Sequence, residues 1–125
     1  CIIEHMLNDK QLVLVDDGLT NLLFIDDLIN IIFIMMKENI IVEYNIGGED
    51  IFSRFELGVK INSFLRPDKA LVSRTSSSKF KTVATRPLNT IVKIDKIKEK
   101  TNFIFTGFNT ALKSILNEMD AKCIK

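Results

Sequence analysis

Residues 22–36 form the longest apolar stretch of this 125-residue chain, and few folds can accommodate such a segment. Asp26, Asp27 and Asn30 interrupt it, so no uncharged window reaches the roughly 18 residues that a membrane-spanning helix needs. From Leu28 to Lys37 a helix would still be apolar on every side. Such a helix is normally buried between other elements. We therefore expect a layered fold that encloses this helix, and no membrane partner.

Apolar runs of strand length lie on both sides of this segment. Residues 12–15 are followed by turn residues at 16–18, and the β-branched run at 40–46 stops at two glycines, 47–48. A strand, a helix and a strand within about 35 residues is the βαβ arrangement, in which the two strands are parallel. The sequence therefore predicts an α/β fold in which residues 12–15 and 40–46 are parallel strands of one sheet.

The second half of the chain predicts further helices. Ser53 and Glu56 have the spacing of a capping box at a helix start, and Pro67 prevents that helix from continuing. The remaining pattern predicts a short strand at residues 70–74, an ordered loop at 75–90, a short helix at 95–100 and an amphipathic helix at 108–119.

The net charge of +1 conceals a strong asymmetry along the chain. Residues 1–62 hold 4 basic and 11 acidic residues, whereas residues 63–125 hold 13 basic and 5 acidic ones. Basic segments bind nucleic acid or small anions, or form a solvated face. Nucleic-acid binding favours interleaved aromatic residues, but Phe80 is the only aromatic residue between positions 66 and 100. We therefore expect no nucleic-acid partner.

Few residues of the chain predict catalysis. There is no glycine-rich phosphate loop, the single histidine is His5, and Cys1 and Cys123 lack metal-ligand spacing. The carboxylate pairs at 16–17 and 26–27 could serve acid–base or magnesium chemistry, but a turn and a helix cap are the favoured interpretations. We therefore assign no catalytic, cofactor-binding or metal-ligating residue. The cysteine usage fits a reducing cytoplasm, and a chain that begins with Cys is expected to be truncated.

Four segments resemble, in the same order, motifs of the dTDP-4-dehydrorhamnose reductases, which are extended short-chain dehydrogenase/reductases. Residues 16–28 are similar to D-D-Q-x-G-x-P-T-x-V-D-D-L, residues 44–49 to Y-N-V-G-G-x, residues 53–57 to S-R-Y-E-L, and residues 85–90 to a segment containing R-P-x-N-[ST]. One departure is that Leu22-Leu23 replaces the family's Pro-Thr.

The resemblance maps the chain onto the C-terminal part of such a reductase. It implies that residues 1–50 are the last βαβ part of a Rossmann-like parallel sheet, and that residues 51–125 form a small, mostly helical substrate-binding lobe. It also implies a parent protein that uses NADP(H) or NAD(H) to reduce a nucleotide-linked deoxy sugar. The family's cofactor loop and catalytic residues belong to an N-terminal part. We expect that part to be the chain's partner, and no cofactor to bind this chain alone.

The resemblance also places Arg86 beside the substrate, and Asn89 of the same motif and Lys81 of the same basic loop are the other candidate substrate-binding residues. Pro87 restricts Arg86 to an extended conformation, and a guanidinium group can bind the oxygens of a diphosphate in pairs. In the alternative interpretation, Arg86 pairs with a carboxylate and fastens its loop. Two other functions remain open: a non-catalytic regulatory subunit similar to that of methionine adenosyltransferase, and a fragment without activity of its own.

Overall fold

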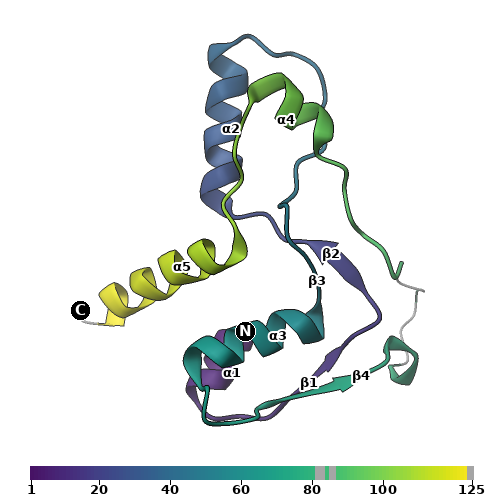
Figure 1. Ribbon diagram of the computed structural model, residues 1–125, viewed down its shortest axis with the longest axis vertical. Helices are drawn as coiled ribbons and strands as arrows, with labels where there is room; N and C mark the ends of the chain where they lie inside the picture. Colours follow the sequence, from purple (N-terminus) through teal and green to yellow (C-terminus); the bar gives the residue numbers. More distant parts are fainter. Residues whose placement is uncertain (81–83, 85–86, 124–125) are drawn as a thin grey trace. The chain divides into compact units, whose positions relative to one another are not determined.

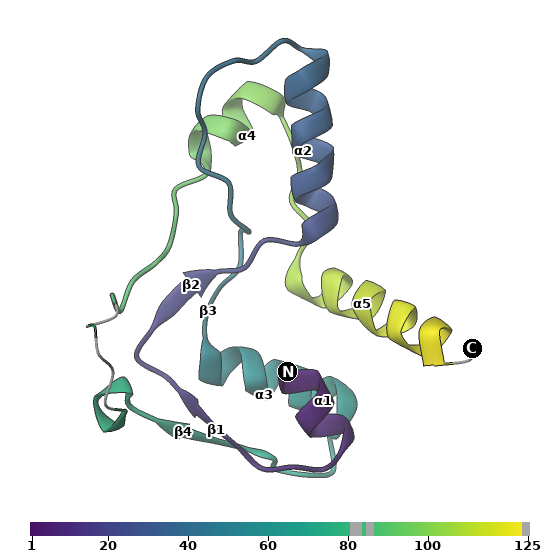
Figure 2. The same cartoon turned by 180° about the vertical axis from the view of Figure 1, so that it is seen from behind.

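The computed structural model describes residues 1–80, 84 and 87–123 (Figures 1 and 2). The chain forms two compact units, each assembled from two separate segments. Unit 1 comprises residues 1–20 and 52–90, and unit 2 comprises residues 21–51 and 91–125. Each unit therefore combines part of the acidic first half of the sequence with part of the basic second half.

Unit 1 is built on a pair of parallel strands. Strand β1 (Leu12–Val15) pairs with β4 (Val72–Thr75), with Leu12 opposite Val72 and Val15 opposite Thr75. Helix α3 (Arg54–Leu65) packs against both strands, and α1 (Ile2–Leu7) packs against α3 (Figure 1). The buried residues of this unit include Ile3, Met6, Phe52, Ile61 and Leu71.

The start of α3 confirms the predicted capping box. The Ser53 hydroxyl accepts a hydrogen bond from the Glu56 amide at 3.1 Å, and the Glu56 carboxylate accepts one from the Ser53 amide at 2.7 Å. Two amides that have no partner within the helix are thereby satisfied. The bond from the Ser53 backbone is the main cause of the lowered pKa of Glu56.

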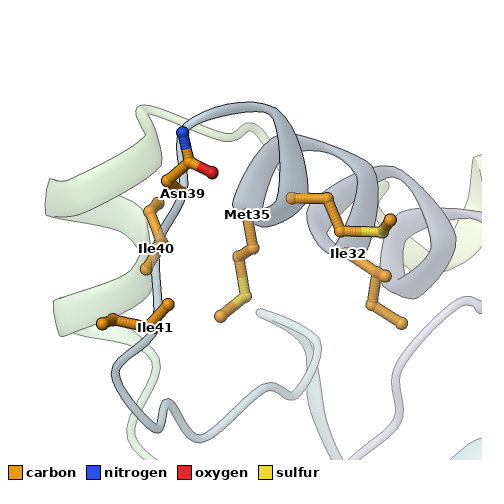
Figure 3. Close-up of a pocket in the computed structure, with 6 residues that line it drawn as sticks. Ile32, Met35, Asn39, Ile40 and Ile41 are labelled. Atoms are coloured by element: carbon orange, nitrogen blue, oxygen red, sulfur yellow. The ribbon is translucent and has the colours of Figure 1, made fainter.

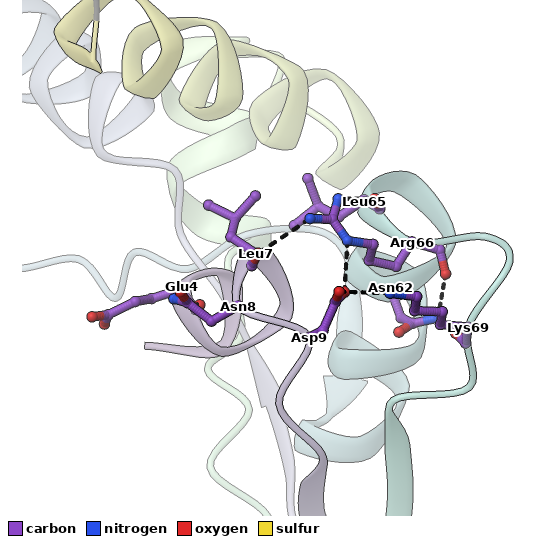
Figure 4. Close-up of polar contacts among 8 residues, drawn as sticks. All are labelled: Glu4, Leu7, Asn8, Asp9, Asn62, Leu65, Arg66 and Lys69. Carbon is purple, nitrogen blue, oxygen red and sulfur yellow. Dashed lines mark hydrogen bonds and ion pairs between the residues drawn. The ribbon is translucent and has the colours of Figure 1, made fainter.

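A surface ion-pair network fastens the other end of α3 (Figure 4). Arg66 Nε and Lys69 Nζ donate to the two carboxylate oxygens of Asp9, at 2.9 and 2.6 Å. Arg66 also donates to the carbonyl of Leu7, the last residue of α1. Hydrogen bonds from Lys69 and then Arg66 lower the pKa of Asp9. The network joins the turn after α1 to the turn that leads from α3 into β4.

Unit 2 is mainly helical. It contains α2 (Ile25–Lys37), α4 (Asp95–Thr101) and α5 (Phe108–Cys123), and α2 and α4 lie side by side in both views (Figures 1 and 2). Ile31, Ile97 and Phe105 form its buried core, and Phe103 packs edge-on against Phe105 with ring centres 5.2 Å apart. In the described parts of the chain, no helix has both the length and the apolar character needed to cross a bilayer.

The α/β class with a parallel strand pair is confirmed, but the predicted pairing was wrong. Residues 40–46 are not a strand, and the parallel partner of β1 is β4. Among the described residues, no backbone hydrogen bond joins residues 41–46 to another segment. A β-branched sequence favours extended backbone, but a strand also needs a partner edge. The connecting helix that packs on the β1–β4 pair is therefore α3, not α2.

The expectation that α2 is enclosed on all sides was also wrong for the chain as it stands. Ile31 is fully buried, yet Phe33 and Met36 are 64% and 68% exposed. Strands β2 (Leu19–Asn21) and β3 (Ile51–Ser53), which pair with each other, were not predicted because both are only three residues long. The predicted division into part of a Rossmann-like sheet at residues 1–50 and a substrate-binding lobe at residues 51–125 stays a prediction.

Candidate ligand-binding site

The carboxyl ends of β1 and β4 meet at one edge of the parallel pair, and polar residues gather there. The Asp16 amide donates to the Thr75 carbonyl at 3.1 Å, which extends the pairing by one residue. One Asp17 oxygen, Oδ2, accepts three hydrogen bonds: from Ser76 Oγ at 2.8 Å, Ser77 N at 2.8 Å and Ser77 Oγ at 2.9 Å. In open α/β sheets, ligands bind outside this edge.

These contacts fix the start of residues 77–90, which we call the basic segment. Ser77–Lys79 forms the short 3₁₀ helix η1, and Lys79 at its end is exposed. The hydrogen bond from Ser76 is the largest cause of the lowered pKa of Asp17, followed by the bond from the Ser77 amide. A carboxylate that is already engaged by three donors holds a turn in place and is poorly suited to acid–base catalysis.

The end of the basic segment is fastened at Leu19, the first residue of β2. The Leu19 amide donates to the Leu88 carbonyl at 2.7 Å, and the Thr90 amide and hydroxyl donate to the Leu19 carbonyl at 2.9 and 3.1 Å. Leu19 and Asn89 thereby form an isolated parallel bridge. Residues 76–77 and residues 88–90 therefore both lie beside residues 17–19, at the carboxyl edge of β1.

The structure describes one of the three predicted substrate-binding residues, Asn89. Asn89 is exposed and lies beside Leu19 at the fastened end of the segment. Lys81 and Arg86 lie outside the described residues. The sequence missed the tie between Asp17 and Ser76–Ser77, which are about sixty positions apart. The only signal for it was a turn carboxylate and a distant run of hydroxyl residues.

The Ser76 and Ser77 hydroxyls and the Ser77 amide at this edge donate to Asp17 Oδ2, whereas the buried Asp17 Oδ1 has no hydrogen-bond partner among the described residues. Lys79, the last residue of η1, is exposed. No group of three or more His, Cys, Asp or Glu side chains in the described residues could hold a metal. The predicted helix-cap role for the second carboxylate pair was wrong: Phe24 is the N-cap of α2, and the buried Asp27 accepts hydrogen bonds from the amide and hydroxyl of Thr106, both at 2.7 Å.

A second cluster explains the motif at residues 44–49. The Asn21 side-chain amide donates to the carbonyls of Gly48 and Val92 at 2.9 and 3.0 Å, and its oxygen accepts from the Val92 amide at 3.0 Å. A Cβ atom on Gly48 would lie 1.9 Å from the Leu22 carbonyl oxygen. The glycine is required because two backbone segments touch there. The cluster is structural, and the sequence did not reveal the role of Asn21.

The described residues do not fit a dinucleotide cofactor. Binding its pyrophosphate requires a glycine-rich turn that leads from a strand directly into a helix N-terminus. Here β1 leads through residues 16–18 into β2, and β4 leads into the three-residue η1. No step of hydride transfer is therefore assigned to this chain.

Comparison with known proteins places these observations in a family. The model of the RmlD substrate binding domain matches residues 2–121. No curated protein matches the chain by sequence.

Three of the solved structures that share its fold show the likeness. Two are dTDP-4-dehydrorhamnose reductases: one from Bacillus anthracis in complex with NADP (TM-score 0.81, 20% identity), and one from Clostridium acetobutylicum (TM-score 0.79, 19% identity). The third is the dTDP-glucose 4,6-dehydratase of Bacillus anthracis in complex with NAD (TM-score 0.70, 20% identity). The matches cover 94%, 94% and 90% of this chain but 41%, 43% and 35% of those proteins.

Proposed function

Because the chain belongs to the RmlD substrate binding domain family, we propose that it is the sugar-nucleotide-binding portion of an NAD(P)H-dependent reductase of the dTDP-4-dehydrorhamnose reductase type. The family match over residues 2–121 carries this proposal. The chain spans less than half the length of the reductases that share its fold. In the proposed parent protein, the dinucleotide-binding part supplies the cofactor site and the catalytic residues.

The geometry of unit 1 supports a ligand role for the basic segment. Its two described ends, at Ser77 and at residues 88–90, are fastened beside residues 17–19 at the carboxyl edge of a parallel strand pair. This edge is where ligands of open α/β sheets bind. Hydroxyl and cationic side chains on the segment suit the diphosphate of a nucleotide-sugar.

Within this segment we propose that Arg86 binds the diphosphate, with Asn89 and Lys81 as further substrate contacts. Arginine offers paired donors to phosphate oxygens, and the following proline keeps its backbone extended. Asn89 reaches the same turn through the Leu19 bridge. In the competing interpretation, Arg86 is a structural tie to a carboxylate.

The test is Arg86→Ala in the longer protein that contains this chain. A ligand role predicts that KM for the dTDP-linked keto sugar rises about tenfold, while kcat and the melting temperature change little. Arg54→Ala is the matched control, because Arg54 is an exposed arginine at the start of α3. If Arg86→Ala unfolds at a lower temperature while KM is unchanged, Arg86 is a structural tie.

The regulatory-subunit alternative is not favoured. The solved structures described above are two reductases and a dehydratase, and none of these three is a regulatory subunit. A longer protein that binds the nucleotide-sugar but does not oxidise NADPH or NADH in its presence would restore that alternative.

A further inference from the structure

Phe80 is an exposed aromatic residue that follows η1 directly. Its side chain is 52% exposed, and it stands between Lys79 and Lys81 in the basic segment. Proteins that bind nucleotides along a strand combine cationic side chains with aromatic rings on which the bases stack, one ring for each stacked base. Because Phe80 is the only aromatic residue between positions 66 and 100, this segment suits a single nucleotide and not a nucleic-acid strand.

The backbone that carries Phe80 is held in place. The Phe80 amide donates to the Ser77 carbonyl at 3.0 Å, and the Lys79 amide donates to the Ser76 carbonyl at 3.2 Å. Ser76 and Ser77 are in turn tied to Asp17, just after β1. The ring therefore extends from a fixed point at the carboxyl edge of the strand pair, where ligands of open α/β sheets bind. A large ring on a fixed backbone loses little conformational entropy when a ligand covers it.

The same edge carries other exposed apolar side chains. Leu19 and Leu88, whose backbones are joined by a hydrogen bond at 2.7 Å, are 39% and 55% exposed. Apolar surface is therefore open at both described ends of the basic segment, and at one of them it adjoins the exposed cation Lys79. A nucleotide has the matching pair of properties, because its flat base and its phosphate groups are attached to one sugar ring.

An open hollow beside α2 offers a different environment (Figure 3). It has a volume of about 480 Å³ and is lined by Ile32, Met35, Met36, Asn39, Ile40 and Ile41. None of these side chains is cationic, so phosphate groups in the hollow would have no charged partner among the lining residues. The edge beside Phe80 is therefore the better nucleotide site of the two.

We propose that the ring of Phe80 stacks against the base of the nucleotide-sugar. This inference rests on the proposed function and adds a contact with the base to the diphosphate contact of the basic segment. Stacking uses the flat face that every base has and does not read the hydrogen-bonding edge. Phe80 therefore contributes affinity for the nucleotide, and other residues choose between bases.

The first experiment is calorimetric titration of the longer protein that contains this chain, with dTDP as the probe. Phe80→Ala is expected to raise the Kd for dTDP about tenfold, because alanine removes the stacking surface. Phe80→Trp keeps an aromatic face, so its Kd is expected to stay within about threefold of the original value. An unchanged Kd in Phe80→Ala overturns the proposal.

Phe64→Ala is the matched control. Phe64 is an exposed phenylalanine of the same unit, at 40%, and it lies near the end of α3, outside the basic segment. Its removal is expected to change the Kd for dTDP by less than about twofold. If Phe64→Ala and Phe80→Ala weaken binding equally, the loss is not specific to Phe80 and the proposal is overturned. If Phe80→Ala does not fold, Phe80→Leu is measured in its place, and the same outcomes apply.

Nuclear magnetic resonance provides a direct readout of the contact. Nuclear Overhauser cross-peaks are expected between phenylalanine ring protons and the thymine methyl group of bound dTDP, and Phe80→Ala should remove them. Cross-peaks that persist in Phe80→Ala assign the contact to another ring and overturn the proposal.

The stacking and the proposed function fail in different ways. If the unmodified protein binds dTDP and Phe80→Ala binds it equally well, only the stacking is contradicted. If Phe80→Ala also has a lower melting temperature, the ring packs against the rest of the longer protein. If the folded, unmodified protein does not bind dTDP, the proposed function is contradicted and the stacking with it. Tighter binding of an oligothymidylate than of dTDP would assign the ring to a nucleic-acid strand and overturn the proposal.

Discussion

At the scale of single residues, two aspartates of this chain hold backbone segments in place through hydrogen bonds. Asp17 fastens Ser76 and Ser77, and the buried Asp27 accepts two hydrogen bonds from Thr106. Both residues belong to aspartate pairs in which only the second member makes these contacts. The pairs resemble acid–base sites in sequence. In each pair, however, the second aspartate is a structural anchor and the first does not share its contacts.

The Asp17 tie makes the stability of unit 1 depend on pH. Its hydrogen bonds lower the pKa of Asp17 below the ordinary value of 3.8, so the folded state favours the ionised form. This stabilisation is present above pH 3.8 and is lost as the pH falls through the lowered pKa. We expect Asp17→Asn to lower the melting temperature by a few degrees at pH 7, and expect the difference from the unmodified chain to close as the pH falls through the lowered pKa of Asp17.

Asp16→Asn is the control for this measurement, because Asp16 has the same side chain in the same turn and accepts no hydrogen bond through it among the described contacts. Thermal denaturation of all three proteins from pH 7 to pH 2.5 gives the comparison. Indistinguishable curves for the two variants would show that Asp17 stabilises the turn no more than its neighbour does.

At the scale of elements, the close contact at Gly48 predicts a large effect from one methyl group. A Cβ atom there would lie 1.9 Å from the Leu22 carbonyl oxygen, and backbone on both sides prevents a simple side-chain adjustment. We expect Gly48→Ala to lower the free energy of unfolding by about 3 kcal/mol, measured by denaturant titration.

Gly18→Ala is the matched control for this element. An added Cβ at Gly18 meets no atom within 4 Å, and Gly18 does not have a positive φ. Its expected change is within about 0.5 kcal/mol of zero. If the two alanine variants are equally stable, the close contact between Gly48 and the Leu22 backbone does not require a glycine at this position.

Sequence patterns predicted a helix well where the residues that stabilise the helix lie within it. The capping box at Ser53 marked the start of α3, and the apolar periodicity marked α5, because both signals lie within the helix itself. Pairing was not predictable in the same way. Residues 40–46 have a better strand composition than β4, yet β4 pairs with β1 because α3 carries the chain back to that edge. The Asp17 and Asn21 ties were missed for the same reason, since their partners lie about 60 and 70 positions away.

At the scale of the whole chain, folding redistributes the charge asymmetry of the sequence. Unit 1 has nine basic and six acidic residues, and unit 2 has eight basic and ten acidic ones. Each unit takes one segment from each half of the chain, so opposite charges meet within it. Asp9 pairs with Arg66 and Lys69 in unit 1, and Glu49 pairs with Lys98 in unit 2. Part of the basic excess of the second half is therefore used in ion pairs that hold each unit together.

The last prediction is that the 125-residue chain does not bind NADPH or NADH with micromolar affinity. Tight dinucleotide binding needs helix amides directed at the pyrophosphate through a glycine-rich turn. The two parallel strands of unit 1 lead instead into β2 and into η1. Calorimetric titration of the chain with NADPH should show no saturable heat below about 1 mM, under conditions where thermal denaturation of the same sample shows cooperative unfolding. Micromolar binding by the folded chain would mean that it holds a cofactor site of a different design, and that hydride transfer cannot be assigned to the partner part alone.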